Sequence, residues 1–133
     1  VLAVATRPMV VSHTGVQGTC PGVRNISDRH MRMIAGKGGV IGIGYFPRAT
    51  CGESVGAIVR SIRHAAERAG VRHVGLGSDF DGLVQVPFDA AGIPGLADAL
   101  LNDGFTEDEV SLIMGGNVLR LLRETLPPRD VPR

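Results

Sequence analysis

Three short apolar runs, separated by segments with helical periodicity, constrain the fold of this chain more than any other feature. The runs cover residues 9–12, 40–45 and 73–78, and helical patterns cover residues 28–37 and 55–69 between them. This order is typical of parallel strands joined by right-handed crossovers. Because the runs are apolar almost throughout, we expect strands that are buried on both faces. Three strands are few for a complete fold of this kind, so we predict an α/β chain that is part of a larger parallel sheet.

The remaining residues predict helices on the carboxyl side of the third run. Helical patterns cover residues 96–101, a segment that begins at Thr106, and residues 117–126. Thr106 and Glu109 have the spacing of a capping box, in which each side chain satisfies a free backbone amide of the other. Gly115 and Gly116 are expected to interrupt the helical pattern.

The composition excludes several classes of function. The 133 residues suffice for one domain with a hydrophobic core. The 14 Lys and Arg residues balance 13 Asp and Glu, which gives a net charge of +1. We therefore expect no nucleic acid as a partner and no polybasic membrane patch. Two cysteines are too few for a fold built on disulfides.

Polar residues at the ends of the predicted strands are the candidates for chemistry. In parallel α/β folds the carboxyl ends of the strands share one edge, where reactive groups gather. His13, Tyr45 and Asp79 follow the three runs, and Arg24 lies in the loop after the first run. A His and an Asp at one edge can bind a metal ion or move a proton. The planar guanidinium of Arg24 suits a carboxylate.

Spacing alone leaves structural explanations of these residues open. His13 would also be explained as a hydrogen-bonded residue at a strand end, and Asp79 with Asp81 as a turn that leaves the strand. His64 falls on the polar face of its helix, where we expect it to be solvated. The glycines at positions 75 and 77 lie inside a strand and lack the helix start of a nucleotide-binding loop.

Five short blocks occur in this order: VVSHT at 10–14, RNISD at 24–28, GGVIG at 38–42, HVGLGSDFDG at 73–82 and GGNVLR at 115–120. Together they resemble the membrane (renal) dipeptidase family of zinc metallopeptidases in its bacterial form. The resemblance implies a (β/α)₈ barrel of the metal-dependent hydrolase type, with residues 1–126 as its last three βα units. Residues 127–133 are then a Pro-rich tail. The last block is expected to be structural and to pack the closing helices.

The resemblance also implies roles for single residues. His13 matches a ligand of a centre with two zinc ions, whose bridging hydroxide attacks the peptide carbonyl of a dipeptide. Arg24 matches the residue that binds the carboxylate of the substrate. Asp79 matches the aspartate that exchanges a proton with that hydroxide. Cys20 and Cys51 match family cysteines that lie close together, either as paired thiols or as a disulfide.

The resemblance further implies metal ligands that this sequence does not contain. The family pattern places a His-x-Asp pair, a bridging Glu and another His on strands before the one that ends at His13. We therefore expect at most weak metal binding and no dipeptide hydrolysis by this chain alone. The strand that starts near Met9 would leave an open edge for the remainder of the barrel or a second copy of the chain.

Two other functions stay open at this point. One is a different hydrolase on the same scaffold, such as a lactonase or deacetylase. If the substrate of that hydrolase has no carboxylate, Arg24 has no role in binding it. The other is a non-catalytic interaction module that has lost its metal centre.

Overall fold

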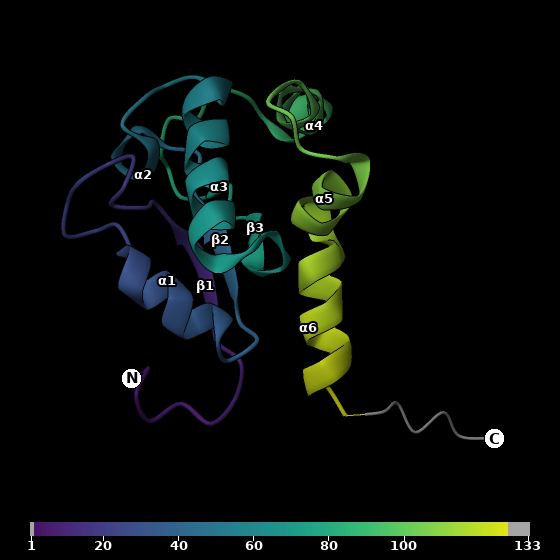
Figure 1. The fold of residues 1–133 in the computed structure, drawn as a ribbon. Coiled ribbons are helices and arrows are strands. Elements are labelled where there is room, and N and C mark those ends of the chain that lie inside the picture. Colours follow the sequence, from purple (N-terminus) through teal and green to yellow (C-terminus); the bar gives the residue numbers. More distant parts are fainter. Residues whose placement is uncertain (1, 128–133) are drawn as a thin grey trace.

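The computed structural model describes residues 2–127 and contains a parallel three-stranded sheet (Figure 1). The strands lie in the order β1-β2-β3 and comprise β1 (Val10–Thr14), β2 (Val40–Ile43) and β3 (Val74–Leu76). Val10 pairs with Val40 in the first ladder, and Ile41 pairs with Val74 in the second. The predicted α/β fold with parallel strands is confirmed.

Helices α1 (Asp28–Ala35) and α3 (Val55–Ala69) form the crossovers between the strands, and a serine caps the amino end of each. The hydroxyl of Ser27 accepts a hydrogen bond from the backbone N–H of His30, and that of Ser54 accepts one from Ala57. These bonds satisfy amides that the first helical turn leaves free. Gly70 ends α3 at a φ of 89°, a conformation that favours glycine. Two short helices, α2 (Pro47–Thr50) and η1 (Val71–His73), flank α3.

The carboxyl-terminal helices run alongside the sheet and α3 (Figure 1). They are η2 (Ala90–Gly92), α4 (Ile93–Asn102), α5 (Glu107–Ser111), a π-helical turn η3 (Leu112–Gly116) and α6 (Asn117–Thr125). The predicted capping box is present, since Thr106 N–H donates to Glu109 Oε2 at 2.9 Å and Glu109 N–H donates to Thr106 Oγ1 at 3.3 Å. Gly115, at a φ of 157°, produces the predicted interruption as a kink between α5 and α6.

Asn117 attaches α6 to the amino end of β3. Its side chain is wholly buried, and Nδ2 donates to the backbone oxygens of Val71 at 2.7 Å and Val74 at 2.8 Å. For Asn117, the expectation that residues 115–117 pack the closing helices is therefore confirmed.

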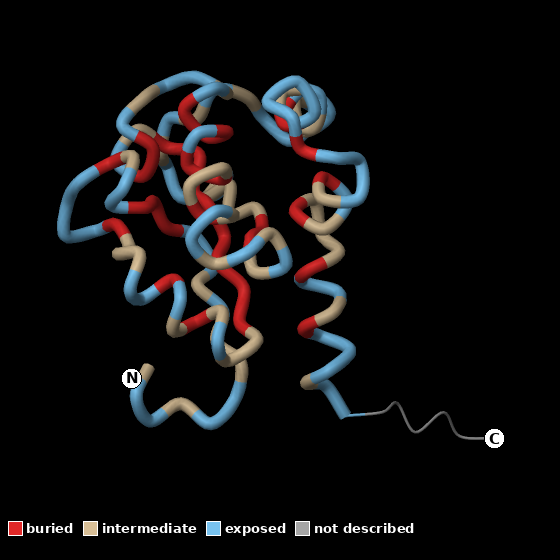
Figure 2. Tube along the Cα trace, in the orientation of Figure 1, coloured by how far each residue is buried: buried red, intermediate tan, exposed pale blue. Residues whose placement is uncertain are grey.

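The core lies between the central strand and the helices (Figure 2). All four residues of β2 are buried, and they contact buried side chains such as Ile58 and Ile62 of α3. The burial of β1 differs from our expectation of strands buried on both faces, because Thr14 alone is buried there and Val10 is 57% exposed. The reason is that β1 is the edge strand of the described sheet and is in contact mainly with β2, so other elements give its side chains little cover. Its outer edge is open, as expected.

Two further expectations concern the ends of the chain and membranes. Of the predicted tail at 127–133, all but Pro127 lies outside the described residues. No helix within residues 2–127 has the length and apolar character needed to cross a membrane.

Candidate functional site

An irregularity in β1 shapes the edge at which the strands end. Val11 pairs with Ile41 and Thr14 pairs with Ile43, so β1 advances three residues while β2 advances two. The extra residue is a β-bulge at positions 12–13. Bulges of this kind bend a strand and redirect its side chains, and they are frequent next to functional sites.

Two glycines make room for this bulge. A Cβ atom on Gly42 or on Gly77 would clash with the backbone oxygen of Ser12. A Cβ on Gly77 would also lie 2.9 Å from the Cα atom of His13. The glycines therefore bring the backbone of β1 against the residues that follow β3, and the carboxyl ends of all three strands converge.

His13 stands exposed at this edge. Its Nδ1 atom is 2.8 Å from the hydroxyl of Ser12, and its ring meets the ring of Phe46 edge-on at a centroid distance of 6.5 Å. Nε2 makes no hydrogen bond within residues 2–127. The imidazole is thus oriented by its neighbours, with one nitrogen free to bind a ligand.

Arg24 reaches the same place from the loop between β1 and α1. Its Nη2 atom donates to the backbone oxygen of His13 at 3.4 Å, and its guanidinium carbon lies 4.6 Å from the centroid of the Phe46 ring. A guanidinium over an aromatic face gains a cation–π interaction that orients it. Among the described residues Arg24 forms no salt bridge, so its charge is available to an anion.

Asp79 follows β3 in a tight turn. It has a φ of 60°, and its backbone oxygen accepts a hydrogen bond from Gly82 N–H at 3.0 Å. A Cβ on Gly82 would lie 2.5 Å from Asp79 Oδ1, so glycine leaves the space that this half-buried carboxylate occupies. Asp81 is exposed. The structure brings His13 and Arg24 into contact, whereas no hydrogen bond or ion pair joins Asp79 to either of them in the described chain.

Tyr45, the third residue at a predicted strand end, belongs to an aromatic cluster. It is fully buried, with ring centroids 5.8 Å from Phe80 and 5.2 Å from Phe88. Burial raises the pKa of its hydroxyl well above the ordinary value. Tyr45 therefore stays neutral and packs the loop after β3 against β2.

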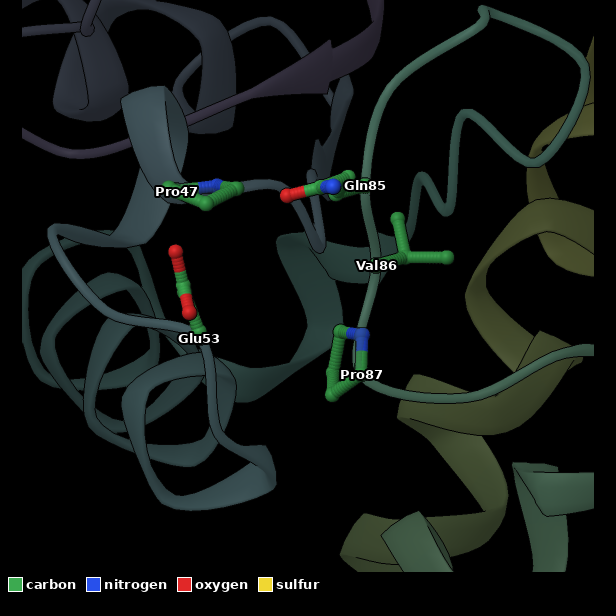
Figure 3. Close-up of a pocket in the computed structure, with 5 residues that line it drawn as sticks. All are labelled: Pro47, Glu53, Gln85, Val86 and Pro87. Atoms are coloured by element: carbon green, nitrogen blue, oxygen red, sulfur yellow. The ribbon is translucent and has the colours of Figure 1, made fainter.

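A separate hollow of about 330 Å³ lies between the loops that follow β2 and β3 (Figure 3). Its lining residues are Pro47, Glu53, Gln85, Val86 and Pro87. His13, Arg24 and Asp79 are not among them. The hollow is therefore distinct from the edge at which His13 and Arg24 meet.

The donor atoms of this chain do not fit a centre of two metal ions by themselves. His13 offers one free ring nitrogen, and no group of three or more His, Cys, Asp or Glu side chains lies close enough together within residues 2–127 to hold a metal ion. A centre with two zinc ions needs several ligands to hold both ions. Within residues 2–127, His13 thus offers a single ring nitrogen to such a centre.

The expectation that His64 is solvated is wrong. Its side chain is 15% exposed, and Nε2 lies 2.7 Å from Oδ1 of Asp28 at the start of α1. Arg68 also contacts this carboxylate, with Nε 3.2 Å from Oδ2. The hydrogen bond from His64 is the main cause that lowers the pKa of Asp28. The pair joins α1 to α3 and so has a structural role.

The two cysteines form a disulfide, with their Cα atoms 5.2 Å apart. The expected proximity of Cys20 and Cys51 is confirmed. The bond ties the loop that carries Arg24 to the segment after α2. Sequence analysis missed Phe46 as the platform beneath Arg24, although its position directly after a strand end was a usable signal. It also missed the buried Asn25, for which no local pattern exists.

Comparison with known proteins relates this chain to a family of peptidases. The family model described as "Membrane dipeptidase (Peptidase family M19)" matches residues 1–128. "Dipeptidase tcpJ" of Claviceps purpurea and "Dipeptidase aclJ" of Aspergillus oryzae are both 35% identical over 130 residues, which cover 92% of this chain and 31% of each relative. This chain thus spans about a third of their length.

A solved structure matches the fold. It is a metallo peptidase from Rhodobacter sphaeroides, liganded with a phosphinate mimic of the dipeptide L-Ala-D-Ala. The two chains are 28% identical and align with a TM-score of 0.84. The alignment covers 94% of this chain and 38% of the peptidase. A probable dipeptidase from Pseudomonas aeruginosa, 20% identical with a TM-score of 0.84, shares the fold.

Proposed function

The chain belongs to the membrane dipeptidase family, peptidase family M19, and on this premise we propose that it supplies the closing strands of a zinc-dependent dipeptidase. In this proposal residues 1–126 are the last three βα units of a (β/α)₈ barrel. The parallel order β1-β2-β3 and the open edge of β1 support it, since a barrel closes by pairing such edges. The match to about a third of the length of the relatives supports it as well.

Arg24 is the residue we assign to recognition of the substrate. The observation that carries this assignment is the guanidinium held on Phe46 and beside His13 without a carboxylate partner in residues 2–127. A dipeptide ends in a carboxylate, and the planar guanidinium binds both of its oxygens. The substrate would then lie across the carboxyl ends of the strands, with its peptide bond near His13.

His13 and Asp79 are assigned to the reacting centre. His13 would bind one of two zinc ions through Nε2, because Nδ1 is engaged with Ser12. Asp79 stands at the end of β3, where its carboxylate would hold a proton and pass it to the amine that leaves the cleaved dipeptide. The remaining metal ligands would come from barrel strands outside this sequence, so we propose that this chain alone is inactive.

A hydrolysis assay tests the proposal. The chain alone and the complete barrel, with the preceding strands attached, are each incubated with zinc and a set of dipeptides. We expect hydrolysis by the complete barrel and none by the chain alone. Turnover by the chain at the rate of the complete barrel would refute the shared metal centre. A complete barrel that hydrolyses no dipeptide would refute the proposed activity.

A further inference from the structure

We propose that Asn25 is a positioning residue that holds Arg24 in place for the carboxylate of the substrate. The inference rests on the proposed function, because it concerns how this site recognises a dipeptide. Asn25 follows Arg24 directly and is 4% exposed, whereas Arg24 is exposed. A buried residue beside an exposed functional one is well placed to fix the backbone from which the functional side chain extends.

The side-chain amide of Asn25 connects three backbone oxygens from two parts of the chain. Nδ2 lies 2.7 Å from the oxygen of Cys20, 3.2 Å from that of Arg48 and 3.4 Å from that of Ala49. Cys20 belongs to the loop after β1, and the other two belong to α2. Two amide hydrogens thus serve acceptors on both segments, and one side chain fastens the loop of Arg24 to α2.

This connection aligns the guanidinium with its platform. Phe46 immediately precedes α2, and its ring is the surface on which the guanidinium of Arg24 lies. Asn25 therefore joins the backbone of Arg24 to the segment that carries the aromatic ring. If the amide is lost, the guanidinium keeps its charge but loses its fixed direction toward the strand ends.

The side chain of Asn25 is tightly packed. A Cβ on Gly15 would clash with the oxygen of Ala49 and with the side-chain oxygen of Asn25. The next residue, Ile26, donates its N–H to the oxygen of Gly15 at 2.9 Å, and its own oxygen accepts from Gln17 N–H at 2.9 Å. The backbone on the carboxyl side of Arg24 is thus fixed on the end of β1, and Asn25 closes the arrangement.

Asn117 offers a matched control. It is also a buried asparagine whose Nδ2 donates to backbone oxygens, those of Val71 and Val74. It does so at the amino end of β3, at the opposite end of the strands from Arg24. Replacing either asparagine with alanine removes the same side-chain donor from backbone oxygens. If the two variants differ in substrate recognition, the cause is therefore the location of Asn25 beside Arg24 and not a general loss of stability.

The test compares Asn25→Ala and Asn117→Ala in the complete barrel. KM and kcat are measured for a dipeptide and for its C-terminal amide, which lacks the carboxylate. We expect Asn25→Ala to raise KM for the dipeptide by roughly tenfold and to leave kcat unchanged. A tenfold rise corresponds to the loss of one charged hydrogen bond between Arg24 and the carboxylate of the substrate. KM for the amide should not move, and Asn117→Ala should leave both constants as they are. Equal changes in the two variants, or an unchanged KM in Asn25→Ala, would overturn the inference.

Two further measurements separate this inference from the proposed function. If the unmodified complete barrel cleaves no dipeptide, the proposed function fails; if it cleaves dipeptides but Asn25→Ala recognises them normally, only the role of Asn25 fails. In this chain by itself, hydrogen exchange of the amides in residues 17–26 should accelerate in Asn25→Ala and not in Asn117→Ala. If Asn25→Ala does not fold, Asn25→Ser replaces it, because serine keeps one donor. Asn25→Ser should show a smaller rise in KM for the dipeptide. An unchanged KM in Asn25→Ser would equally refute the positioning role of Asn25.

Discussion

The two ends of the sheet use buried hydrogen bonds for different purposes. At the amino ends, Asn117 holds Val71 and Val74, and Arg120 donates to the backbone oxygens of Gly38 and Arg72. These bonds attach α6 to the starts of β2 and β3, and the groups that they join are structural.

At the carboxyl ends, similar bonds hold a loop that presents an exposed guanidinium. Asn25 and the disulfide fix the segment around Arg24, whose side chain lies beside the exposed His13 at the end of β1. The same chemistry therefore gives rigidity at one end and a positioned, accessible set of side chains at the other. Parallel α/β folds divide stability and function between their ends in this way.

Removal of the disulfide should have the largest effect on stability. The bond closes a loop with a sequence separation of 31. Replacing Cys20 and Cys51 together by serine should lower the free energy of unfolding by about 3–4 kcal/mol, because the unfolded chain gains conformational freedom. Urea unfolding measures this change. A reductant should destabilise the unmodified chain by a similar amount and leave the double variant unaffected; a reductant-insensitive unmodified chain would contradict the prediction.

Replacement of Arg24 should lower the catalytic efficiency toward dipeptides and leave the contacts at the amino end of the sheet intact. In the complete barrel, Arg24→Met should lower kcat/KM for dipeptides by roughly a hundredfold, through the loss of charged hydrogen bonds worth about 3 kcal/mol. Cleavage of C-terminal amides should change little. Arg29→Met, at an exposed position of α1, removes the same charge away from the strand ends and is the control. Equal losses for dipeptides and amides would show that Arg24 does not bind the carboxylate.

The comparison of the two ends also explains which features the sequence could predict. The extent of α3, from Val55 to Ala69, agrees with its apolar periodicity, and the capping box of Thr106 and Glu109 agrees with its spacing. Both depend on residues a few positions apart, whose interactions are formed within one helix. The placement of Asp79 after a strand end also followed from parallel topology.

Contacts between distant residues were not predictable from local patterns, and the proximity of Cys20 and Cys51 was expected from the family resemblance alone. The amide of Asn25 meets Arg48 across 23 positions, and His64 meets Asp28 across 36. Neither pair has a periodic signal, because the contact forms only after the crossovers have packed. The bulge at positions 12–13 likewise depends on glycines in β2 and after β3, and it determines how His13 is presented.

Loss of the Asn117 amide should have a smaller effect, confined to stability. Asn117→Ala removes two side-chain hydrogen bonds to backbone oxygens at the amino end of β3 and should lower the free energy of unfolding by about 2 kcal/mol. Urea unfolding of this chain measures the loss. Asn102→Ala, at an exposed position at the end of α4, should be nearly neutral and serves as the control. A neutral Asn117→Ala would show that the contacts of α6 do not depend on this amide.

The smallest predicted effect is a pH dependence that links α1 to α3. The hydrogen bond from His64, with the nearby charges of Arg68 and Arg32, lowers the pKa of Asp28 below its ordinary value of 3.8. The folded chain therefore binds this proton more weakly than the unfolded chain. The resulting stability is present above the unfolded pKa and is lost as the pH falls through the folded pKa. Because the carboxylate is 35% exposed, solvent screening should keep the contribution below about 1 kcal/mol.

Urea unfolding between pH 7 and roughly pH 2 tests this prediction. The free energy of unfolding should fall less steeply with decreasing pH in Asp28→Asn than in the unmodified chain. Asp98→Asn, on α4, is the control and should retain the full slope; identical slopes in all three proteins would show that the pair does not stabilise the contact between the helices.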